Sequence, residues 1–196
     1  MIAIMFGPPG SGKGTQASRV ASRLGIPHVA AGDMLRDEVA RGTALGREAK
    51  PIMDAGGLVP DDLVVRMIDS RLNQPDAAPG VLLDGYPRTI AQADALDSML
   101  AARAEHVAVV ISLEVPDEEL RARILRRAGI EGRSDDTADR LDQRLRVYRG
   151  ETEPVLEHYR AAGTRIRAID GVGDIDAITE LIVNAMRGNG APVGAA

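Results

Sequence analysis

The sequence predicts an α/β fold in which a parallel sheet is covered by helices on both faces. Short and almost continuously apolar segments alternate along the chain with longer segments of helical periodicity. A strand buried on both faces is apolar throughout, whereas a helix that covers a sheet is apolar along one stripe only. No internal repeat is visible, and 196 residues with 44% hydrophobic composition suffice for one domain with a sizeable core.

Five segments are candidate strands. Four of them are the apolar runs of the alternation, and the fifth, PHVA, is shorter and gives a weaker signal. Since helical segments separate them along the chain, we expect these strands to run parallel to one another. The five segments are IAIMF (2–6), PHVA (27–30), VLLD (81–84), VAVVISL (107–113) and TRIRAID (164–170).

Apolar residues at helical spacing predict helices over 13–24, 138–159 and 174–187. Two further short helices, about 33–41 and 44–55, follow each other with no strand between them. A polar, glycine-containing stretch, 128–136, also interrupts the alternation. Both interruptions are compatible with ordinary surface loops, and equally with mobile flaps over a site.

Composition excludes several classes of protein. The net charge of −5 and the 2% of aromatic residues argue against a nucleic acid polymer as partner, because such sites need cations and stacking rings. The chain has no cysteine, which excludes disulfides, thiol catalysis and cysteine-built zinc sites. No signal peptide or membrane-spanning run is apparent, so we expect a cytoplasmic protein that does not enter the membrane, with a frayed tail at 189–196.

The stretch GPPGSGKGT, residues 7–15, follows the first strand and opens the first helix. Gly7, Gly12 and Lys13 fit the pattern G-x-x-x-x-G-K, although Gly14 stands where Ser or Thr is usual and Thr15 comes one place later. Glycines let backbone N–H groups converge on an anion, and the helix adds the positive end of its dipole. The alternative is a glycine-rich turn with an exposed lysine. The strand before and the helix after favour a phosphate-binding loop and a P-loop NTPase-like fold.

This loop alone does not identify the reaction, since switches, motors and kinases all use it. A GTPase would also carry Asn-Lys-x-Asp, which is absent. Asp84 ends a predicted strand at the same edge of the sheet, where a carboxylate can hold magnesium directly or through water, or can instead cap a turn. Arg88 follows, and its guanidinium suits a phosphate, although a lone arginine is more often a solvated surface residue.

Five motifs in this order and spacing resemble the adenylate kinases of the nucleoside monophosphate kinase family. The resemblance extends to about residue 186. The motifs are GPPGSGKGT, AAGDMLR, GGLVPDDLV, DGYPRTIAQ and GRSDD.

The resemblance implies reversible transfer of the γ-phosphoryl group of ATP to AMP, giving two ADP, with Mg²⁺. We expect no zinc, because a chain without cysteines cannot hold the four-cysteine zinc site that some related lids use. It also implies a monomer built on a five-stranded parallel core, with two mobile inserts. The AMP-binding insert is expected at 30–59 and a short ATP lid at 126–137, and the core then comprises residues 1–29, 60–125 and 138–188.

The same resemblance assigns roles to individual residues. Asp33 and Asp84 orient water around the magnesium ion. The residues assigned to ATP are Gly10, Ser11, Gly12, Lys13, Gly14, Thr15, Arg123, Arg127 and Gly173. Those assigned to AMP are Ala31, Arg36, Gly57, Leu58, Val59, Gly85, Tyr86, Pro87, Arg88, Gln92, Arg133 and Arg144. The cations expected to act on the transferred phosphoryl group are Lys13, Arg88, Arg127, Arg133 and Arg144.

The residues themselves are consistent with this chemistry, which needs positioning and charge neutralisation rather than a protein nucleophile. We therefore interpret His28, His106 and His158 as structural or surface residues. Arg144 reaches a cleft only if its helix turns the flank shared with Arg140 and Tyr148 inward; otherwise it is a surface charge.

One position departs from the adenylate kinase pattern. Adenylate kinases usually have Thr where this chain has Ala31, and Ala at this position resembles UMP/CMP kinases. Gln92, in contrast, offers a donor and an acceptor that suit adenine. We favour AMP as the acceptor and keep a UMP/CMP kinase as the alternative. A non-catalytic nucleotide-binding module, or a P-loop kinase for another small acceptor such as shikimate, would not need the arginines or the 30–59 insert.

Overall fold

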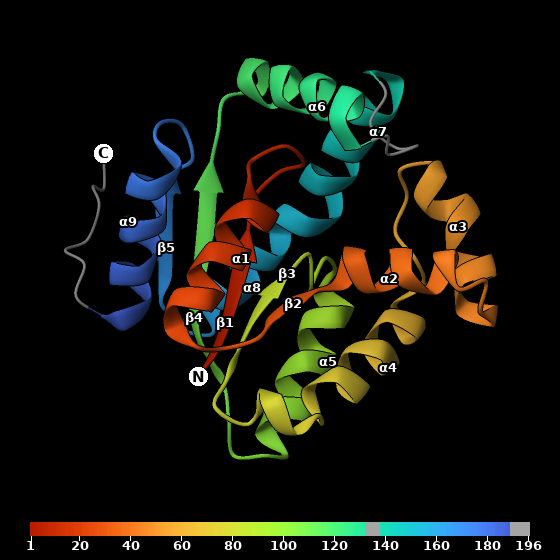
Figure 1. Ribbon diagram of the computed structural model, residues 1–196. Helices are drawn as coiled ribbons and strands as arrows, with labels where there is room; N and C mark the ends of the chain where they lie inside the picture. The colour runs from red at the N-terminus through yellow and green to blue at the C-terminus, as the bar shows by residue number, and fades with distance from the viewer. Residues whose placement is uncertain (132–137, 189–196) are drawn as a thin grey trace.

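The computed structural model of the chain describes residues 1–131 and 138–188; for 127–131, 138 and 139 it describes the helical backbone alone. Five parallel strands form one sheet in the order β2-β3-β1-β4-β5, with β1 at its centre (Figure 1). This confirms the predicted fold class. The strands are β1 (Ile2–Phe6), β2 (His28–Ala30), β3 (Val81–Asp84), β4 (Val107–Glu114) and β5 (Ile166–Asp170).

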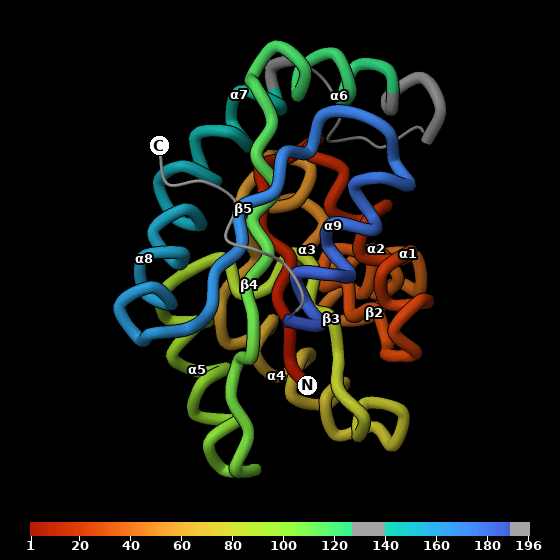
Figure 2. Tube along the Cα trace, turned by 90° about the vertical axis from the view of Figure 1, so that its left-hand side faces the viewer, coloured from red at the N-terminus to blue at the C-terminus, as the bar shows by residue number. Residues whose placement is uncertain are grey.

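Alternate residues of β1 pack against two different helical layers. Ile2, Ile4 and Phe6 belong to one buried cluster, and Ala3 and Met5 belong to another. Successive side chains of a strand point to opposite faces, so both faces of the sheet are covered. The helices of the first layer are α4 (Asp61–Leu72), α5 (Ile90–Ala101) and α8 (Glu153–Ala161); those of the second are α1 (Lys13–Leu24) and α9 (Ile175–Arg187), which lies beside α1 (Figures 1 and 2).

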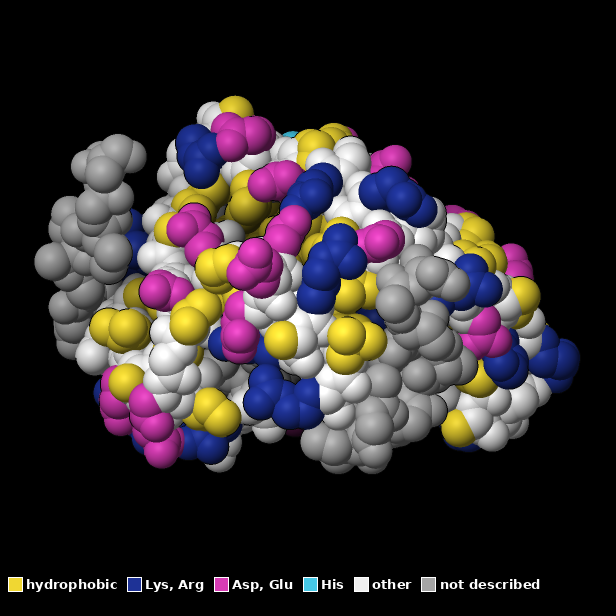
Figure 3. Space-filling view, turned by 90° about the horizontal axis from the view of Figure 1, so that it is seen from above, with side chains coloured by type: hydrophobic (Ala, Val, Ile, Leu, Met, Phe, Trp, Pro, Cys, Tyr) yellow, Lys and Arg dark blue, Asp and Glu magenta, His cyan; other side chains and the backbone are white. Residues whose placement is uncertain are grey.

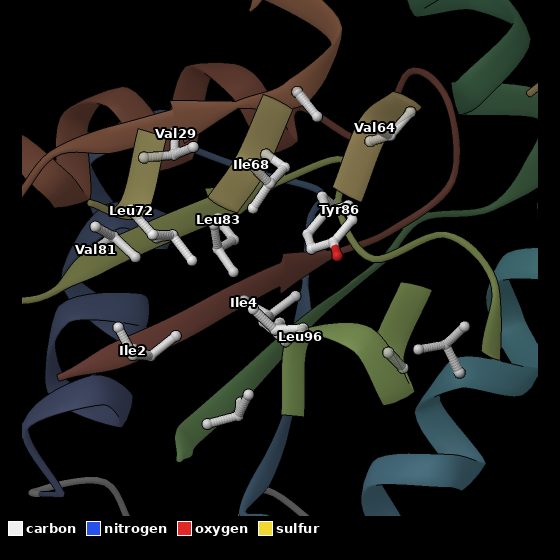
Figure 4. Close-up of a cluster of buried hydrophobic side chains, with 14 of the residues drawn as sticks. Ile2, Ile4, Val29, Val64, Ile68, Leu72, Val81, Leu83, Tyr86 and Leu96 are labelled. Carbon is white, nitrogen blue, oxygen red and sulfur yellow. The ribbon is translucent and has the colours of Figure 1, made fainter. Parts of the chain in front are cut away.

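The first layer contains the larger apolar cluster. Ile4 and Leu83 of the sheet meet Ile68 of α4 and Leu96 of α5, and all four side chains are buried (Figure 4). Burial of such a side chain contributes about 1.5–3 kcal/mol to folding. The buried phenol ring of Tyr86 closes this cluster next to the carboxyl end of β3. The segment that carries Arg88 is therefore anchored directly to the core.

The insert after β2 consists of two helices, as predicted. They are α2 (Ala31–Ala40) and α3 (Ala44–Asp54). Thr43 begins α3 as its cap, because its hydroxyl accepts a 3.0 Å hydrogen bond from the backbone N–H of Gly46. A Cβ atom at Gly46 would lie 2.0 Å from the carbonyl oxygen of Glu38, so only glycine lets the two helices approach this closely.

The segment predicted as one helix over 138–159 is divided in the structure. It forms α7 (Ala138–Val147), a π-helical turn (Tyr148–Thr152) and α8. Pro154 lies in the first turn of α8 and has no N–H to donate to the carbonyl four residues earlier. The hydrogen-bond ladder therefore changes register just before it. The apolar periodicity alone does not reveal this change.

The helices α6 (Asp117–Glu131) and α7 lie across the carboxyl ends of the strands (Figure 1). A third, smaller apolar cluster joins them through Leu120, Ile124, Leu141 and Leu145. Basic and acidic side chains are interspersed on this end of the molecule (Figure 3). A short 3₁₀ turn, Pro75–Ala77, precedes β3. In the part of the chain that the structure describes, no helix is long and apolar enough to cross a lipid bilayer.

Candidate active site

The glycine-rich loop lies at the carboxyl end of the central strand. Gly10 has φ +84°, and a Cβ atom there would lie 2.9 Å from the carbonyl oxygen of Leu120, so no other residue fits. Gly12 precedes α1 with φ +90°, and no side chain caps the helix. Since no side chain caps the first backbone N–H groups of α1, these groups can donate to an anion, as at other anion-binding helix N-termini.

Lys13 is the first residue of α1. Its ammonium group donates a 3.0 Å hydrogen bond to the carbonyl oxygen of Pro8, which holds the side chain over the loop. Gly14 and Thr15 follow it along the same open cleft, and Asp33 lies in the cleft wall. Ser11, within the loop, is almost completely buried. The cleft thus combines backbone donors, one lysine and several oxygen-bearing side chains.

Asp84 ends β3 and borders this cleft, and its carboxylate lies 3.3 Å from the imidazole Nε2 of His28. Burial opposes ionisation of Asp84, but the hydrogen bond to His28 and the charges of Lys13 and Arg88 outweigh it, so the pKa of the carboxyl is lowered. A partly buried, ionised carboxylate facing a cleft of oxygen ligands is suited to a hydrated divalent cation. The sequence analysis did not place His28 here.

Arg88 is fixed at three points after β3. Its Nε donates to the carbonyl oxygen of Gly85 at 2.9 Å, its backbone N–H donates to Gln92 Oε1 at 2.8 Å, and its carbonyl accepts from Thr152 at 3.0 Å. Gly85 has φ +70°, and a Cβ atom there would lie 2.9 Å from the guanidinium. The arginine is thus held in place by the main chain around it before any ligand binds.

Arg144 reaches the same place from α7. A Cβ atom at Gly56 would lie 3.2 Å from Cγ of Arg144, so the glycine at the end of the insert lets α7 approach. Arg88 and Arg144 both line three adjoining pockets. Lys13 shares two of these pockets with them. Three cations that are distant in sequence therefore surround one region of the cleft.

A second pocket lies on the insert side of Arg88. The residues that line it include the apolar side chains of Leu35, Met53 and Val64 and the guanidinium groups of Arg36, Arg88 and Arg144. Arg36 is ion-paired with Asp33. The predicted residues that line this pocket are Ala31, Arg36, Gly57, Leu58, Val59, Gly85, Arg88, Gln92 and Arg144.

Tyr86, Pro87 and Gln92 are placed differently from one another. Pro87 and Tyr86 both line the pocket that Arg88 shares with Lys13. The phenol of Tyr86 is directed into the core, where its hydroxyl donates to the carbonyl of Gln92 at 3.1 Å. Gln92 is only 2% exposed, yet it borders the second pocket. Its amide is held by hydrogen bonds to Arg88 and to Asp61 of α4, a residue that the sequence analysis did not select.

Arg123 connects the phosphate loop to the segment after β5. Its guanidinium pairs with Glu119 and donates to the carbonyl oxygens of Ser11 at 3.4 Å and Gly171 at 3.0 Å. Gly173, with φ +132°, has no neighbour within 4 Å of the position of a Cβ atom. Its backbone is therefore open on that side. The side chain of Arg127 and the whole of Arg133 lie outside the described residues.

Sequence reasoning missed His28 and Asp61, because each reaches the site only through tertiary packing. His28 and Ala30 share one face of β2, and Ala30 pairs with Asp84 across the parallel ladder. The order of the strands, which places β2 beside β3, was the missing information. Asp61 begins a helix directly after the insert, but only the packing of α4 against α5 brings it to Gln92.

These features define a class of protein: a P-loop phosphotransferase whose phosphate loop adjoins a second polar pocket through shared arginines. The family model described as adenylate kinase matches residues 5–164. An adenylate kinase of Stenotrophomonas maltophilia is 50% identical over 187 residues, covering 95% of this chain and 100% of its own length. Those of Micrococcus luteus and Thermus thermophilus are each 50% identical, covering 93% and 89% of this chain and 89% and 91% of their own lengths. The chain belongs to the adenylate kinase family.

Proposed function

We propose that the cleft transfers the γ-phosphoryl group of ATP to AMP, with ATP on the phosphate loop and AMP in the pocket between α2, α3 and α5. One observation carries this assignment: Arg88 and Arg144 border both the phosphate-loop cleft and the second pocket. A phosphoryl group passing from one nucleotide to the other would remain next to both guanidinium groups throughout. Each of the two arginines could therefore contact both nucleotides.

On the ATP side, the loop from Gly10 to Thr15 would bind the phosphates through its backbone N–H groups and the ammonium of Lys13. Arg123 would support the phosphate loop, because its guanidinium joins Ser11 of the loop to the segment after β5. That segment includes Gly173, whose open backbone could receive the adenine ring. Arg127 would approach the phosphates from the lid.

On the AMP side, Arg36 and Arg88 would bind the phosphate. Arg36 now pairs with Asp33, so the AMP phosphate would replace a carboxylate partner rather than meet a solvated cation. Leu58, Val59 and Gln92 would surround the base, since all three border the second pocket. Ala31 begins α2 there and contributes only a methyl group.

In the transfer, an oxygen of the AMP phosphate attacks the γ-phosphorus of ATP. A new P–O bond forms as the bond from the γ-phosphorus to the β,γ-bridging oxygen breaks, and both products are ADP. No side chain becomes a nucleophile. Lys13, Arg88 and Arg144, joined by Arg133, would neutralise the charge on the phosphoryl oxygens as it shifts towards the bridging oxygen.

The residues around Asp84 fit a magnesium ion. The cleft offers carboxylate and hydroxyl oxygens from Asp84, Asp33 and Thr15, which are the donor atoms that this ion prefers. The lowered pKa of Asp84 keeps that carboxylate charged. Asp84 and Asp33 would hold the ion through its water molecules. When bound, magnesium offsets the negative charge of the ATP phosphates.

We further propose that the insert at 30–59 and the lid at 126–137 close over the two nucleotides and exclude water, which would otherwise accept the phosphoryl group. The support for this is the position of α2 and α3 at one side of the cleft and of α6 and α7 across its top. We also propose a monomer as the active form, as the resemblance to the family implies.

A coupled assay with ATP and AMP, CMP, UMP or GMP in parallel tests the proposal. We expect ADP production to be fastest with AMP and to require Mg²⁺. Faster turnover of CMP or UMP would overturn the assignment of the acceptor pocket, for which Ala31 is the residue to examine. No transfer to any monophosphate, with ATP still bound, would indicate a nucleotide-binding module without catalysis.

A further inference from the structure

The side-chain amide of Gln92 has one orientation that satisfies its neighbours. Its Oε1 accepts the backbone N–H of Arg88 at 2.8 Å, and its Nε2 donates to Oδ1 of Asp61 at 2.7 Å. The backbone N–H can only donate and the carboxylate oxygen accepts. In a flipped amide, Nε2 would face the backbone N–H of Arg88, donor against donor, and Oε1 would face the carboxylate of Asp61, acceptor against acceptor. The chemistry of these two partners therefore fixes the amide.

Asp61 is itself held by a closed set of hydrogen bonds. Its second oxygen, Oδ2, accepts from the hydroxyl of Thr89 at 2.9 Å. That hydroxyl also accepts from the backbone N–H of Gln92 at 3.1 Å, as the cap of α5. Only a side chain with two acceptor oxygens can satisfy both Thr89 and Gln92 in this way. The first residue of α4 is thus tied to the first turn of α5.

The amide of Gln92 retains capacity for a ligand. An amide has two N–H donors and two acceptor lone pairs, and the two bonds just described use one of each. The residue borders the second pocket although it is 2% exposed. One donor and one acceptor, in a fixed order, thus remain at the edge of the pocket that we assign to AMP.

We propose that Asp61 is a positioning residue that selects the base of the acceptor nucleotide through Gln92. This inference rests on the proposed function, in which Gln92 meets the base of AMP. Adenine presents an amino donor beside a ring-nitrogen acceptor. Hypoxanthine, the base of inosine monophosphate (IMP), presents a carbonyl acceptor beside an N–H donor along the same edge. An amide of fixed orientation matches adenine and places like groups opposite hypoxanthine.

The preference for AMP over IMP, as the ratio of their kcat/KM values, is the quantity to measure. In Asp61→Ala the amide loses its acceptor and is free to turn away, and this ratio should fall by about tenfold. In Asp61→Asn an acceptor oxygen remains for Gln92, so most of the preference should be kept although the charge is gone. If the alanine variant does not fold, Asp61→Ser replaces it, because serine is too short to reach Gln92 and Thr89 together.

Asp62→Ala is the matched control. Asp62 is the next carboxylate in the first turn of α4, and it pairs with Arg66 rather than with Gln92. The substitution Asp62→Ala removes the same charge from the same helix end, so the AMP-to-IMP ratio of this variant should stay at the wild-type value. A loss that is equal for AMP and IMP in Asp61→Ala would mean that Asp61 is only structural, and it would overturn the inference.

A double-substitution cycle separates the two proposals. In a Gln92→Met background, Asp61→Ala should no longer change the AMP-to-IMP ratio, because it acts through the missing amide. A further change in that background would overturn the inference while leaving the role of Gln92 intact. If Gln92→Met itself leaves the ratio unchanged, then the placement of the AMP base is wrong.

Discussion

Arg88, in the segment after β3, and Arg144, on α7, line the same three adjoining pockets beside the phosphate loop. The two residues come from different elements: Arg88 is fixed to the core by Gly85 and Thr152, and Arg144 packs against Gly56 of the insert. Under the proposed function, the phosphoryl group transferred between the two nucleotides would lie next to both guanidinium groups.

Arg144→Ala should lower kcat by about 10²- to 10³-fold, because a guanidinium that meets the charge of the transferred group is lost. Arg146→Ala is the control, since Arg146 lies on the same helix, is exposed and bonds only to Gln143 among the contacts described for it. Steady-state kinetics with ATP and AMP compare the two. Similar kcat values for both variants would show that Arg144 is a surface charge.

Lys13→Ala should also lower kcat by about 10²-fold or more, with little change in thermal stability. Its ammonium donates to the carbonyl of Pro8 above the loop, at the edge of the cleft rather than within the apolar core. Lys50, the other lysine of the chain, is exposed and pairs with Asp54 on α3. Lys50→Ala should therefore keep wild-type turnover. Near-normal kcat in Lys13→Ala would remove this residue from the transfer step.

Most of the fold follows from local patterns. The five strands and the helices of the insert were predicted because apolar runs and amphipathic spacing are properties of neighbouring residues. The division between α7 and α8 was not, since the apolar stripe continues through Tyr148–Thr152 although Pro154 changes the hydrogen bonding. A pattern of side chains reports which face is buried, but it does not report the backbone ladder.

The site is less accessible to this reasoning. Lys13 and Arg88 lie in recognisable motifs, whereas Asp61 matters only through a contact with Gln92 that depends on the packing of α4 against α5. His28 was interpreted as structural or surface, yet the order of the sheet brings it against Asp84. Arg133 lies outside the described residues, so its role stays a prediction.

The tyrosines give a prediction of pH dependence. Burial raises the pKa of Tyr148 to about 12, with a further contribution from Glu153 and Glu114, and burial also raises the pKa of Tyr86 and Tyr159. These are the 3 tyrosines of a chain without tryptophan, so tyrosinate absorbance is easy to follow. The native protein should show no phenol ionisation near pH 10, whereas the urea-unfolded chain should titrate there.

The same shifts make the free energy of unfolding depend on pH. Above pH 10 the unfolded chain releases phenolic protons that the native state retains, so the native state binds more protons and the free energy of unfolding falls as pH rises. Below pH 10 both states hold these protons and the slope from the tyrosines vanishes. The measurement is urea unfolding from pH 8 to 11. A native titration that coincides with the unfolded one would contradict the burial of these rings.

The contact between α1 and α9 gives a prediction about stability. The hydroxyl of Thr179 lies 2.7 Å from Oε1 of Gln16, and both side chains are buried. The same hydroxyl also lies 2.8 Å from the carbonyl oxygen of Ile175, and its one proton can be donated to either oxygen. Thr179→Val removes this donor and should cost about 1–3 kcal/mol in the free energy of unfolding, measured in urea. Thr179→Ser keeps the hydroxyl and should cost less.

Adding Gln16→Leu to Thr179→Val removes the unpaired acceptor, so the double variant should be more stable than the sum of the single effects implies. Strictly additive losses would mean that the two side chains do not act as a hydrogen-bonded pair.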